Sequence, residues 1–416
     1  MTLLMLTKLY PFGTGEAFIE NEIPILARYY EKIVIVACEV PREEERIREL
    51  PECAAAYRID SVGKSADIAA GLIKYFFSGS PDMKSGRKEC RSLAQRVFLS
   101  YFEAKSRRIF REILQKNILD QLNGSPYILY SYWLFVTART GTLISARQKP
   151  VYSFTRAHRY DLYADKNRLN YLPFRALLLS GYDRILPCSD NGTEYLKKLY
   201  PQYADKIRTS FLGTGDHGVG CASTDGVFRI FSCSRVVPVK RVDRIVSALK
   251  ILDDKRLKIK WTHIGGGEGL DALKAMTADK LKYIRYEFTG DVPNRMVLDM
   301  YRSAPADLFV NVSSSEGLPV SVMEAMSFGI PTVATDVGGT SEIVSDLTGK
   351  LIPDDFDDSE LAAIIEELYL SHDTKSYRKL RKDCRRFWEE HFQASVNYDR
   401  LCRDIVPLYN KKLVMK

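Results

Sequence analysis

The chain has 416 residues, of which 45% are hydrophobic and 11% aromatic, and it contains 25 Gly and 8 Cys. This composition excludes a disordered chain, a collagen-like chain and a small disulfide-stapled scaffold, and the length fits two or three domains with sizeable cores. No apolar run reaches the length of about 18 residues that a membrane-spanning helix needs. The scattered cysteines form no CxxC pair, which argues against a zinc site and fits reduced thiols in a cytoplasmic protein.

The positive charge is concentrated in the first half of the chain. Residues 1–210 contain 32 Lys and Arg against 23 Asp and Glu, whereas the two signs nearly balance in residues 211–416. Ten of the basic residues lie between Lys84 and Lys116. They are interleaved with Phe98, Tyr101, Phe102, Ile109, Phe110 and Ile113. Such a stretch is either a solvated helix face or a surface for an anionic membrane, a nucleic acid or an acidic acceptor.

Short apolar runs alternate with helical patterns along the chain. The run Leu3–Leu6 predicts a buried strand rather than a secretion signal, and it is followed by a helical pattern at Ala17–Tyr30. Further strands are predicted at Ile33–Ala37, Tyr127–Tyr130, Val151–Phe154, Arg184–Pro187, Phe228–Ser232, Lys258–Ile264, Ile284–Phe288, Leu308–Asn311 and Thr332–Ala334. This alternation predicts two parallel sheets with helices on both faces. Residues 61–125 interrupt it and predict a helical insertion, and the glycine-rich segment 212–218 is the predicted joint.

The segment after the strand that ends at Asn311 has the features of a ligand-binding turn. Pro319 suits the first position of a helix, and Gly329 suits the position after the helix ends. The turn would leave the N–H groups of Gly317, Leu318 and Val320 free. Because free N–H groups at a helix N-terminus bind phosphates, this turn is a candidate anion site.

Two carboxylates belong to the same segment. Glu316 stands at the opening of the turn, and Glu324 lies eight residues farther, roughly 12 Å along the helix axis. The pair could contact the two ends of an elongated ligand. Taken alone, Glu316 could equally complement the helix dipole, and Glu324 could be an ordinary exposed helix residue.

Two cations follow another predicted strand. Arg235 and Lys240 lie on one loop, at the end of the strand Phe228–Ser232. Fixed cations at the carboxyl edge of a parallel sheet suit a pyrophosphate whose negative charge grows as it departs. The alternative is a surface pair without function.

These residues resemble a known family. Arg235 and Lys240, followed by Glu316-x7-Glu324, resemble the signature of glycosyltransferase family 4, which comprises retaining transferases of the GT-B architecture. Residues 329–351 are similar to the same family, so the resemblance is strong over residues 213–355. It implies an α/β fold of two Rossmann-like, doubly wound parallel-sheet domains that face each other across a cleft.

The resemblance also implies the domain boundaries. An acceptor-side domain is expected at residues 1–212 with the last helix, at about 394–416, and a nucleotide-sugar-binding domain at residues 213–393. Residues 387–416 carry an apolar stripe of helical spacing. Because the last helix returns to the first domain in that architecture, we expect a break near Gln393.

Two segments of the first half resemble the family more loosely. The glycine-rich loop with Gly13, Gly15 and Glu16 enters a helical pattern that echoes a run found in polysaccharide-building members. His158 and Asp161 resemble the family's His-Gly-x-Asp segment, although Arg159 replaces the glycine.

The resemblance implies a role for each candidate residue. The catalytic residues would be Glu316, His158, Arg235 and Lys240; the donor-binding residues Gly13, Gly15, Arg235, Lys240, Gly265, Gly290, Val292, Glu316, Gly317, Leu318, Val320 and Glu324; and the acceptor-binding residues Glu16, Arg156 and Asp161. Glu324 would accept hydrogen bonds from the ribose, and Glu316 from sugar hydroxyls. Arg235 and Lys240 would stabilise the leaving diphosphate, so neither a metal nor another cofactor is expected.

The leading hypothesis is therefore a retaining glycosyltransferase. It would transfer a sugar from a nucleotide-diphosphate sugar to a glycan or lipid-linked acceptor in cell-surface polysaccharide synthesis. The alternatives are a nucleotide-sugar epimerase of GT-B architecture and a non-catalytic nucleotide-sugar-binding protein. Because no nucleic-acid-binding module is apparent, we expect no nucleic-acid partner. We expect a cytoplasmic protein that docks peripherally, through the basic stretch, on the anionic inner face of the membrane.

Overall fold

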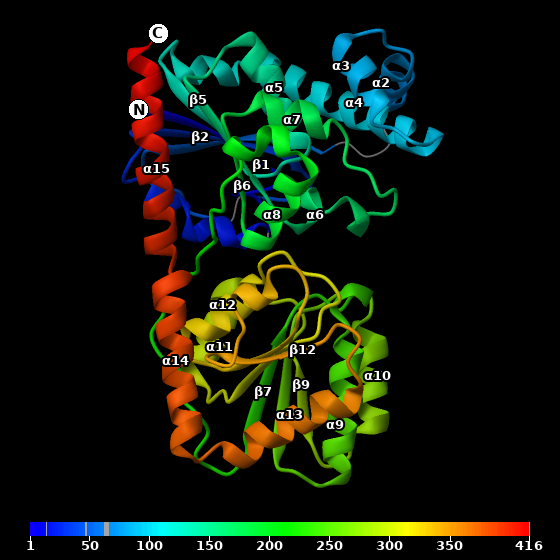
Figure 1. Ribbon diagram of the computed structural model, residues 1–416, viewed down its shortest axis with the longest axis vertical. Coiled ribbons are helices and arrows are strands. Elements are labelled where there is room, and N and C mark those ends of the chain that lie inside the picture. The colour runs from blue at the N-terminus through cyan, green and yellow to red at the C-terminus, as the bar shows by residue number, and fades with distance from the viewer. Residues whose placement is uncertain (14, 46–47, 62–65, 416) are drawn as a thin grey trace. The chain divides into compact units, whose positions relative to one another are not determined.

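The computed structural model of the protein describes residues 1–13, 15–45, 48–61 and 66–415. The chain forms two units, the first made of Met1–Phe211 with Tyr398–Lys416 and the second of Leu212–Asn397. Each unit contains a six-stranded parallel sheet with helices on both faces (Figure 1). The predicted α/β class with two doubly wound parallel sheets is confirmed.

The sheet of the first unit has the order β3-β2-β1-β4-β5-β6. Its strands are β1 (Thr2–Thr7), β2 (Lys32–Val40), β3 (Ala54–Asp60), β4 (Tyr127–Ser131), β5 (Tyr152–Ala157) and β6 (Arg184–Pro187). The chain order reverses between the central strands β1 and β4. In open α/β sheets ligands bind beyond the carboxyl ends of the strands at such a reversal.

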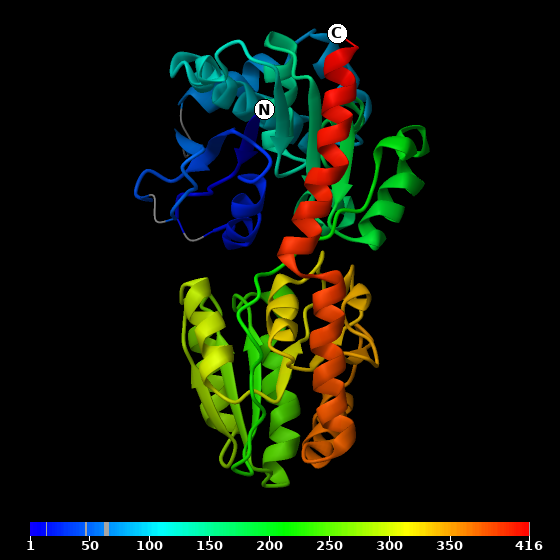
Figure 2. The ribbon, with the colours of Figure 1, turned by 90° about the vertical axis from the view of Figure 1, so that its left-hand side faces the viewer.

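Alternate side chains of the first sheet enter two cores, because successive residues of a strand point to opposite faces. Leu4 and Leu6 pack with one set of helices, and Leu3 and Met5 with the other. The first set comprises α4 (Leu93–Gln115), α5 (Val136–Arg147), α7 (Arg175–Gly181) and α8 (Asp190–Leu199); the second comprises η1 (Ala17–Asn21), α1 (Ile23–Leu26) and α15 (Ala394–Val414). Figure 2 shows α15, in red, running along the first unit.

Two features of the first unit differ from what the sequence predicted. The predicted helix Ala17–Tyr30 is a 3₁₀ turn, η1, followed by the four-residue helix α1. Pro24 has no N–H to bond back to the preceding turn, so the two pieces do not join. The edge strand β3 was not predicted, because its alanine-rich start carries little β-propensity.

Residues 66–122 form the predicted helical insertion. It consists of α2 (Ala66–Phe76), α3 (Pro81–Lys88), α4 and the 3₁₀ turn η2 (Ile118–Leu122). Phe102, Ile109 and Ile113 of α4 lie in the core of the unit, so they cannot form the exposed apolar side that the sequence indicated. The other short elements of the unit are α6 (Arg159–Leu162), η3 (Ala164–Lys166) and η4 (Pro201–Lys206).

The sheet of the second unit has the order β12-β11-β10-β7-β8-β9, so its chain order reverses between β7 and β10. Its strands are β7 (Phe228–Cys233), β8 (Ile259–Ile264), β9 (Arg285–Phe288), β10 (Leu308–Asn311), β11 (Thr332–Thr335) and β12 (Gly349–Ile352). The short edge strand β12 was not predicted. Its first residue is Gly349, whose φ of +156° is one that other residues rarely adopt, and glycine is a weak strand signal.

Helices cover both faces of the second sheet. The core on one face is shared with α9 (Val242–Asp254), α10 (Leu270–Lys280) and α13 (Asp358–Ser371). The other helices are α11 (Asn294–Ser303), α12 (Val320–Ser327) and α14 (Lys375–His391), with the 3₁₀ turns η5 (Pro238–Lys240) and η6 (Thr340–Glu342). Helix α14 ends at His391 and α15 begins at Ala394, where the sequence predicted a break.

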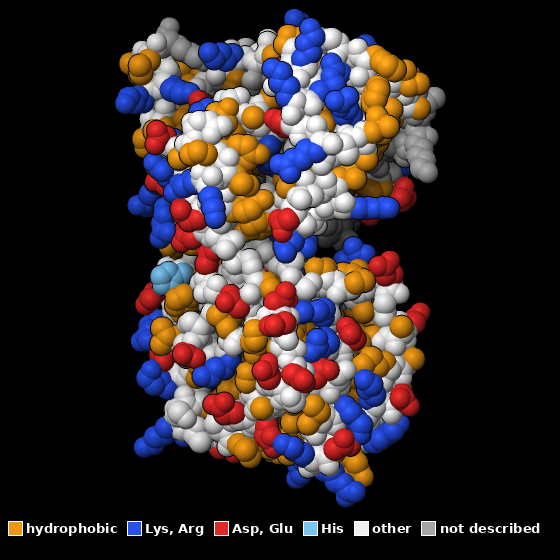
Figure 3. Space-filling view, turned by 45° about the vertical axis from the view of Figure 1, so that its right-hand side comes forward, with side chains coloured by type: hydrophobic (Ala, Val, Ile, Leu, Met, Phe, Trp, Pro, Cys, Tyr) orange, Lys and Arg blue, Asp and Glu red, His pale blue; other side chains and the backbone are white. Residues whose placement is uncertain are grey.

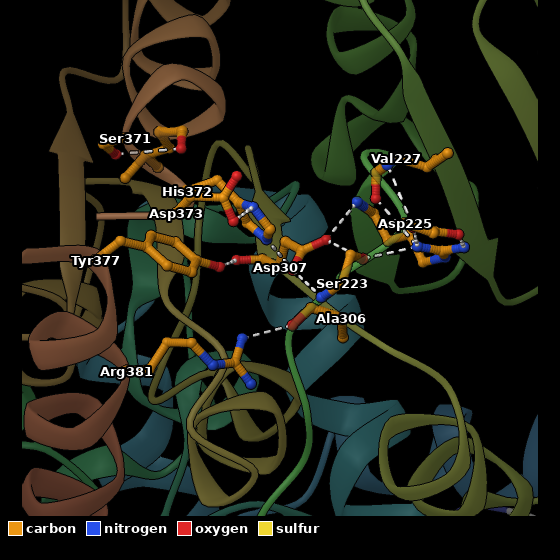
Figure 4. A network of polar contacts seen from close by, with 12 residues as sticks. Ser223, Asp225, Val227, Ala306, Asp307, Ser371, His372, Asp373, Tyr377 and Arg381 are labelled. Atoms are coloured by element: carbon orange, nitrogen blue, oxygen red, sulfur yellow. Dashed lines mark hydrogen bonds and ion pairs between the residues drawn. The ribbon is translucent and has the colours of Figure 1, made fainter. Parts of the chain in front are cut away.

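A buried carboxylate organises the amino edge of the second sheet (Figure 4). Asp307, just before β10, is fully buried and accepts hydrogen bonds from Ser223 N at 2.8 Å, Ser223 Oγ at 2.5 Å and Arg229 N at 2.7 Å. Nε2 of His372, between α13 and α14, lies 3.0 Å from Asp307 Oδ1. Tyr377 Oη donates to the Asp307 carbonyl at 2.6 Å. The amino edge lies opposite the edge where ligands bind, so we assign this network to stability.

Candidate functional site

An ion pair lies at the reversal point of the second sheet. Lys240 comes from the connection after β7, and Glu316 from the connection after β10. Lys240 Nζ donates to Glu316 Oε1 at 2.5 Å, and Asn311 Nδ2 lies 3.4 Å from the same oxygen. The side chains of Lys240 and Glu316 are 25% and 10% exposed. Both groups are therefore held in place while part of each can still be reached by a ligand.

Neighbouring loops clamp the backbone that carries Glu316. A Cβ on Gly338 would lie 2.0 Å from the Glu316 carbonyl oxygen, and its φ is +59°, so only glycine fits there. Gly339 N donates to the Gly317 carbonyl at 2.8 Å, and Ser314 N donates to the Val239 carbonyl at 2.8 Å. The loops after β7 and β11 thus fix the position of the Glu316 loop.

The helix that follows, α12, begins one residue later than expected. Pro319 is its N-cap residue, with extended ψ of 105°, rather than its first helical residue. The helix starts at Val320, and N–H groups of a first helical turn have no acceptor within the helix. Leu318 and Gly317 are buried beside this helix start. The predicted anion-binding turn therefore adjoins the Lys240–Glu316 pair.

Glu324 lies on α12 and is only 6% exposed. Asn294 Nδ2 donates to its Oε1 at 2.8 Å, and burial raises the pKa of the Glu324 carboxyl to about 7. The charge of Glu324 also contributes to raising the pKa of Cys233, at the end of β7, to about 12, although burial is the larger cause. Glu324 thus lies near the same edge of the sheet, with a pKa well above that of an ordinary glutamate.

The loops after β7, β8 and β9 pack against one another. Gly265 N donates to the Gly290 carbonyl at 3.0 Å, and a Cβ on Gly265 would lie 2.1 Å from the Ser234 carbonyl oxygen. Gly265 and Gly290, both expected to bind the donor, are therefore in contact, and Gly265 allows the close approach of the Ser234 backbone. Val292 is half-buried, and Arg235 is exposed and forms no ion pair with any residue that the structure describes.

In the first unit, the side chain of Glu16 is hydrogen-bonded to the loop that follows β1. Its carboxylate accepts hydrogen bonds from the N–H groups of Lys8, Leu9 and Tyr10, and from Trp133 Nε1. Gly13 N donates to the Glu45 carbonyl at 3.1 Å, and a Cβ on Gly15 would lie 2.8 Å from the Leu9 side chain. These contacts support a loop-forming role for all three predicted residues.

His158, Arg156 and Asp161 lie at or just beyond the end of β5. The fully buried Arg156 donates to Tyr130 Oη at 2.8 Å and to the Ser210 carbonyl at 2.7 Å. The Asp161 carboxylate accepts from His158 N at 2.6 Å and from Leu134 N at 2.5 Å, and burial raises its pKa to about 7. Arg156 and Asp161 are thus bonded within the unit.

The imidazole of His158 has an aromatic environment, unlike the side chains of Arg156 and Asp161. It lies among the rings of Phe18, Tyr132 and Trp133. Burial, and secondarily the charge of Arg156, lower its pKa to about 3, so it is neutral at physiological pH. Its Nε2 is buried and has no hydrogen-bond partner among the described residues.

Sequence reasoning missed the side chains that position the acidic residues. Asn311 and Asn294 each bond one of the two glutamates, and Asp291 Oδ1 accepts from Gly266 N at 2.8 Å to hold the loop after β8. Asn311 is the last residue of a predicted strand, and this position is the sequence signal that could have identified it. Asn294 lies 30 positions before its partner, so no local pattern could find it.

Residues 222–387 match the sequence profile of the family described as "Glycosyl transferases group 1". The O-antigen biosynthesis glycosyltransferase WbnH of Escherichia coli is 30% identical over 138 residues, which are 33% of this chain and 37% of that protein. The putative colanic acid biosynthesis glycosyltransferase WcaL of Escherichia coli K12 is 27% identical over 208 residues, which are 47% of this chain and 50% of that protein. The matches thus span between about a third and half of these relatives.

Two solved structures resemble the whole chain. Anabaena Alr3699/HepE, determined in complex with UDP and glucose, is 13% identical with a TM-score of 0.67, over 98% of this chain and 99% of that chain. The apo form of the lipopolysaccharide outer core galactosyltransferase WaaB is 12% identical with a TM-score of 0.61, over 100% of this chain and 99% of that chain. At this identity the likeness shows the fold, which is the two-sheet GT-B architecture.

Proposed function

We propose that this chain, whose residues 222–387 form a group 1 glycosyltransferase domain, transfers a sugar from a nucleotide-diphosphate donor to a glycan or lipid-linked acceptor. The observation that carries the proposal is the Lys240–Glu316 pair beside the start of α12, at the reversal of a doubly wound sheet. The UDP and glucose in the Anabaena structure support the donor class. The O-antigen and colanic acid relatives support a cell-surface polysaccharide as the product.

We assign donor binding to Leu212–Asn397 and acceptor binding to Met1–Phe211 with Tyr398–Lys416. Lys240, the exposed Arg235 and the N–H groups at the start of α12 would bind the diphosphate. As the bond from the anomeric carbon to the diphosphate oxygen breaks, negative charge grows on that oxygen, and fixed donors stabilise it. Because these groups supply the positive charge, the proposed mechanism requires no divalent metal.

The acidic residues would orient the donor. Glu316 would accept hydrogen bonds from hydroxyls of the transferred sugar, and Glu324 from the ribose hydroxyls. The neutral His158 can exchange a hydrogen bond with a sugar hydroxyl. We propose retention of configuration: the acceptor oxygen bonds to the anomeric carbon on the face that the diphosphate leaves. The acceptor proton passes to the departing phosphate oxygen, so no covalent enzyme intermediate is needed.

Incubation with a panel of UDP- and GDP-sugars tests this function. We expect the release of a nucleoside diphosphate from one donor, accelerated by an acceptor glycan, with the sugar bonded to that acceptor. Conversion of the nucleotide-sugar to an epimer without an acceptor would identify the epimerase instead. Binding of a nucleoside diphosphate without turnover of any donor or acceptor would identify a non-catalytic binding protein.

The raised pKa of Glu324 predicts an effect of pH. The pKa of the folded state, about 7, exceeds the ordinary value of 4.5, so the buried carboxylate destabilises the fold above pH 7. This cost fades as the pH falls through 7 and is absent below about 4.5. Glu324→Gln should therefore raise the free energy of unfolding at pH 8, by at most about 3 kcal/mol, and the gain should vanish near pH 4.5.

The same variant should bind UDP about tenfold more weakly at pH 8, because a carboxylate accepts hydroxyl hydrogen bonds more strongly than an amide. Calorimetry at pH 6 and pH 8 on both proteins measures this. Protonation of UDP itself affects both proteins alike, so the ratio of the two affinities isolates Glu324. A ratio that does not shrink as the pH falls would contradict the assignment.

Membrane docking is the second part of the proposal. None of the helices formed by the described residues is long and apolar enough to cross a bilayer. Helices α2 and α4 nevertheless leave large apolar side chains uncovered, from the end of α2 and the first half of α4. These are Ile73, Phe77, Leu93, Val97 and Tyr101, which we call the apolar α2–α4 face, and Phe77 is 79% exposed. Exposed apolar patches of this kind mark interaction surfaces.

Exposed basic residues belong to the same helical insertion as the apolar α2–α4 face. Lys74, Lys84, Lys88, Arg91 and Arg96 are exposed, and none forms an ion pair with a described residue. Figure 3 shows Lys and Arg side chains, in blue, over the first unit with some Asp and Glu, in red, among them, and both kinds interspersed over the second. Because each basic residue gains about 1 kcal/mol near an anionic bilayer, we propose that this face docks on anionic lipid.

Flotation with phosphatidylcholine vesicles, with and without phosphatidylglycerol, tests the docking. We expect binding only to the anionic vesicles, and about tenfold weaker binding for Phe77→Ser, because an aromatic side chain would no longer enter the interface. Leu370→Ser removes an equally exposed apolar side chain, 72% exposed on α13, and serves as the control. Equal binding by Phe77→Ser and the unmodified protein would overturn the assignment.

A further inference from the structure

An open cavity of about 230 Å³ lies in the first unit and has no role in the donor chemistry described above. It is bounded by the ends of β1 and β2, by α4, and by the segment from the end of β4 to the start of α5. Its lining residues are Lys8, Glu39, Lys105, Trp133, Phe135, Val136, Thr137 and Tyr160. Because the chain order of this sheet reverses between β1 and β4, the cavity lies where such sheets bind ligands.

Three aromatic side chains form the walls of this cavity. Trp133 is fixed by the hydrogen bond from its Nε1 to Glu16, and Phe135 and Tyr160 pack edge to face, with ring centroids 5.2 Å apart. Rings of this kind offer flat apolar area. The volume is below the roughly 300–1,000 Å³ of sites for drug-sized ligands. A single sugar ring suits such a cavity better than a whole nucleotide-sugar.

The two ammonium groups of the cavity are paired differently. Lys105 Nζ lies 2.7 Å from Glu39 Oε2, so one ammonium and one carboxylate form a pair. Lys8 is exposed and its ammonium has no ion-pair partner among the described residues, while the nearby Glu16 carboxylate is bonded to Lys8 N and Trp133 Nε1. Val136, which also lines the cavity, is the first residue of α5, so the positive end of a helix dipole adds to the positive charge of Lys8.

We infer that this cavity binds an acidic sugar residue of the acceptor, one that carries a carboxylate or a phosphate group. The anionic group binds Lys8 beside the Lys105–Glu39 pair, and the Glu39 carboxylate accepts hydrogen bonds from ring hydroxyls. The aromatic walls contact the apolar face of the ring. The inference rests on the proposed transferase function, since it names the class of acceptor for that reaction.

The chain has a built-in reporter for this cavity. Of its three tryptophans, Trp133 lines the cavity, whereas Trp261 and Trp388 are fully buried in the second unit. Titration of the full chain with methyl glucuronide, glucose 6-phosphate and methyl glucoside should therefore change the emission of Trp133. We expect at least one acidic probe to bind about tenfold or more tightly than the neutral glucoside, as charge-assisted hydrogen bonds allow. The two acidic probes distinguish a carboxylate from a phosphate.

Lys8→Ala should remove most of this preference. Lys149→Ala removes an exposed lysine from the connection that leads into β5, away from the cavity, and should leave the preference intact. Equal binding of the neutral glucoside, binding of neither acidic probe, or an unchanged preference in Lys8→Ala would overturn the inference. UDP binding, measured by calorimetry on the same preparation, separates the two proposals. If UDP binds and the acidic sugars do not, only the acceptor assignment fails; if no nucleoside diphosphate binds, the transferase proposal fails.

Discussion

Lys240→Ala is expected to lower the rate of sugar transfer by roughly 10²–10³-fold, the usual cost of removing one donor that stabilises developing negative charge. The ammonium lies 2.5 Å from Glu316 Oε1, so its loss removes a charge from the diphosphate and also frees the Glu316 carboxylate to move. Release of nucleoside diphosphate in the presence of acceptor measures the rate. The fold should survive, because Lys240 is 25% exposed and Asn311 still contacts the carboxylate.

Two companion variants make this prediction specific. Glu316→Gln keeps the size of the side chain but loses the charge, and we expect a comparable loss of rate. Lys250→Ala removes a lysine from an exposed pair with Asp254 on α9 and should transfer sugar at the normal rate. Near-normal rates in both Lys240→Ala and Glu316→Gln, with unchanged thermal stability, would rule out the proposed site.

Asp307→Ala is expected to have the largest effect on stability. The carboxylate is fully buried and accepts hydrogen bonds from the backbone and hydroxyl of Ser223 and from Arg229 N (Figure 4). Its removal leaves these donors, and the His372 ring, without their acceptor in the interior. Breaking one side of a buried charged network typically costs about 3–5 kcal/mol. For a domain of this size the midpoint temperature of thermal unfolding should fall by roughly 10 °C.

Calorimetric unfolding of the full chain measures this effect, and the transition of the second unit is the one that should move. Asp225→Ala provides the matched control, because Asp225 bonds the side chain of Arg229 in the same network but is 55% exposed. We expect that variant to unfold at nearly the normal temperature, since exposed ion pairs contribute little. Equal shifts for the two variants would show that burial of Asp307 is not the cause.

The alternation of strands and helices, and the positions of Lys240 and Glu316 after strand ends, could be predicted from local sequence. Runs such as Leu3–Leu6 and Leu308–Asn311 are apolar on both faces, which is typical of strands buried between helix layers. Asn311 ends a strand and Glu316 follows within the same turn, so the chain itself brings these residues to one edge. The strands β3 and β12 were missed, because edge strands are short and their residues have weak propensities.

The hydrogen-bond partners of several predicted site residues are residues far away in the sequence. Glu16 matched the family pattern, yet its carboxylate bonds the loop after β1 and Trp133, 117 positions away. Arg156 and Asp161 are likewise bonded inside the first unit. A sequence pattern identifies a polar residue near a strand end, but hydrogen-bond partners decide whether its side chain is still available to a ligand.

The alternation of apolar runs with helical patterns predicted the two parallel sheets, and residue counts established the excess of positive charge in residues 1–210, because periodicity and charge are local and additive. Only the tertiary structure decided how those charges and apolar groups are used. It buried Phe102 and left Phe77 exposed, raised the pKa of Glu324 to about 7, and gathered Lys8 and Lys105 around one cavity. These properties depend on burial and on long-range contacts, which arise only when distant segments pack together.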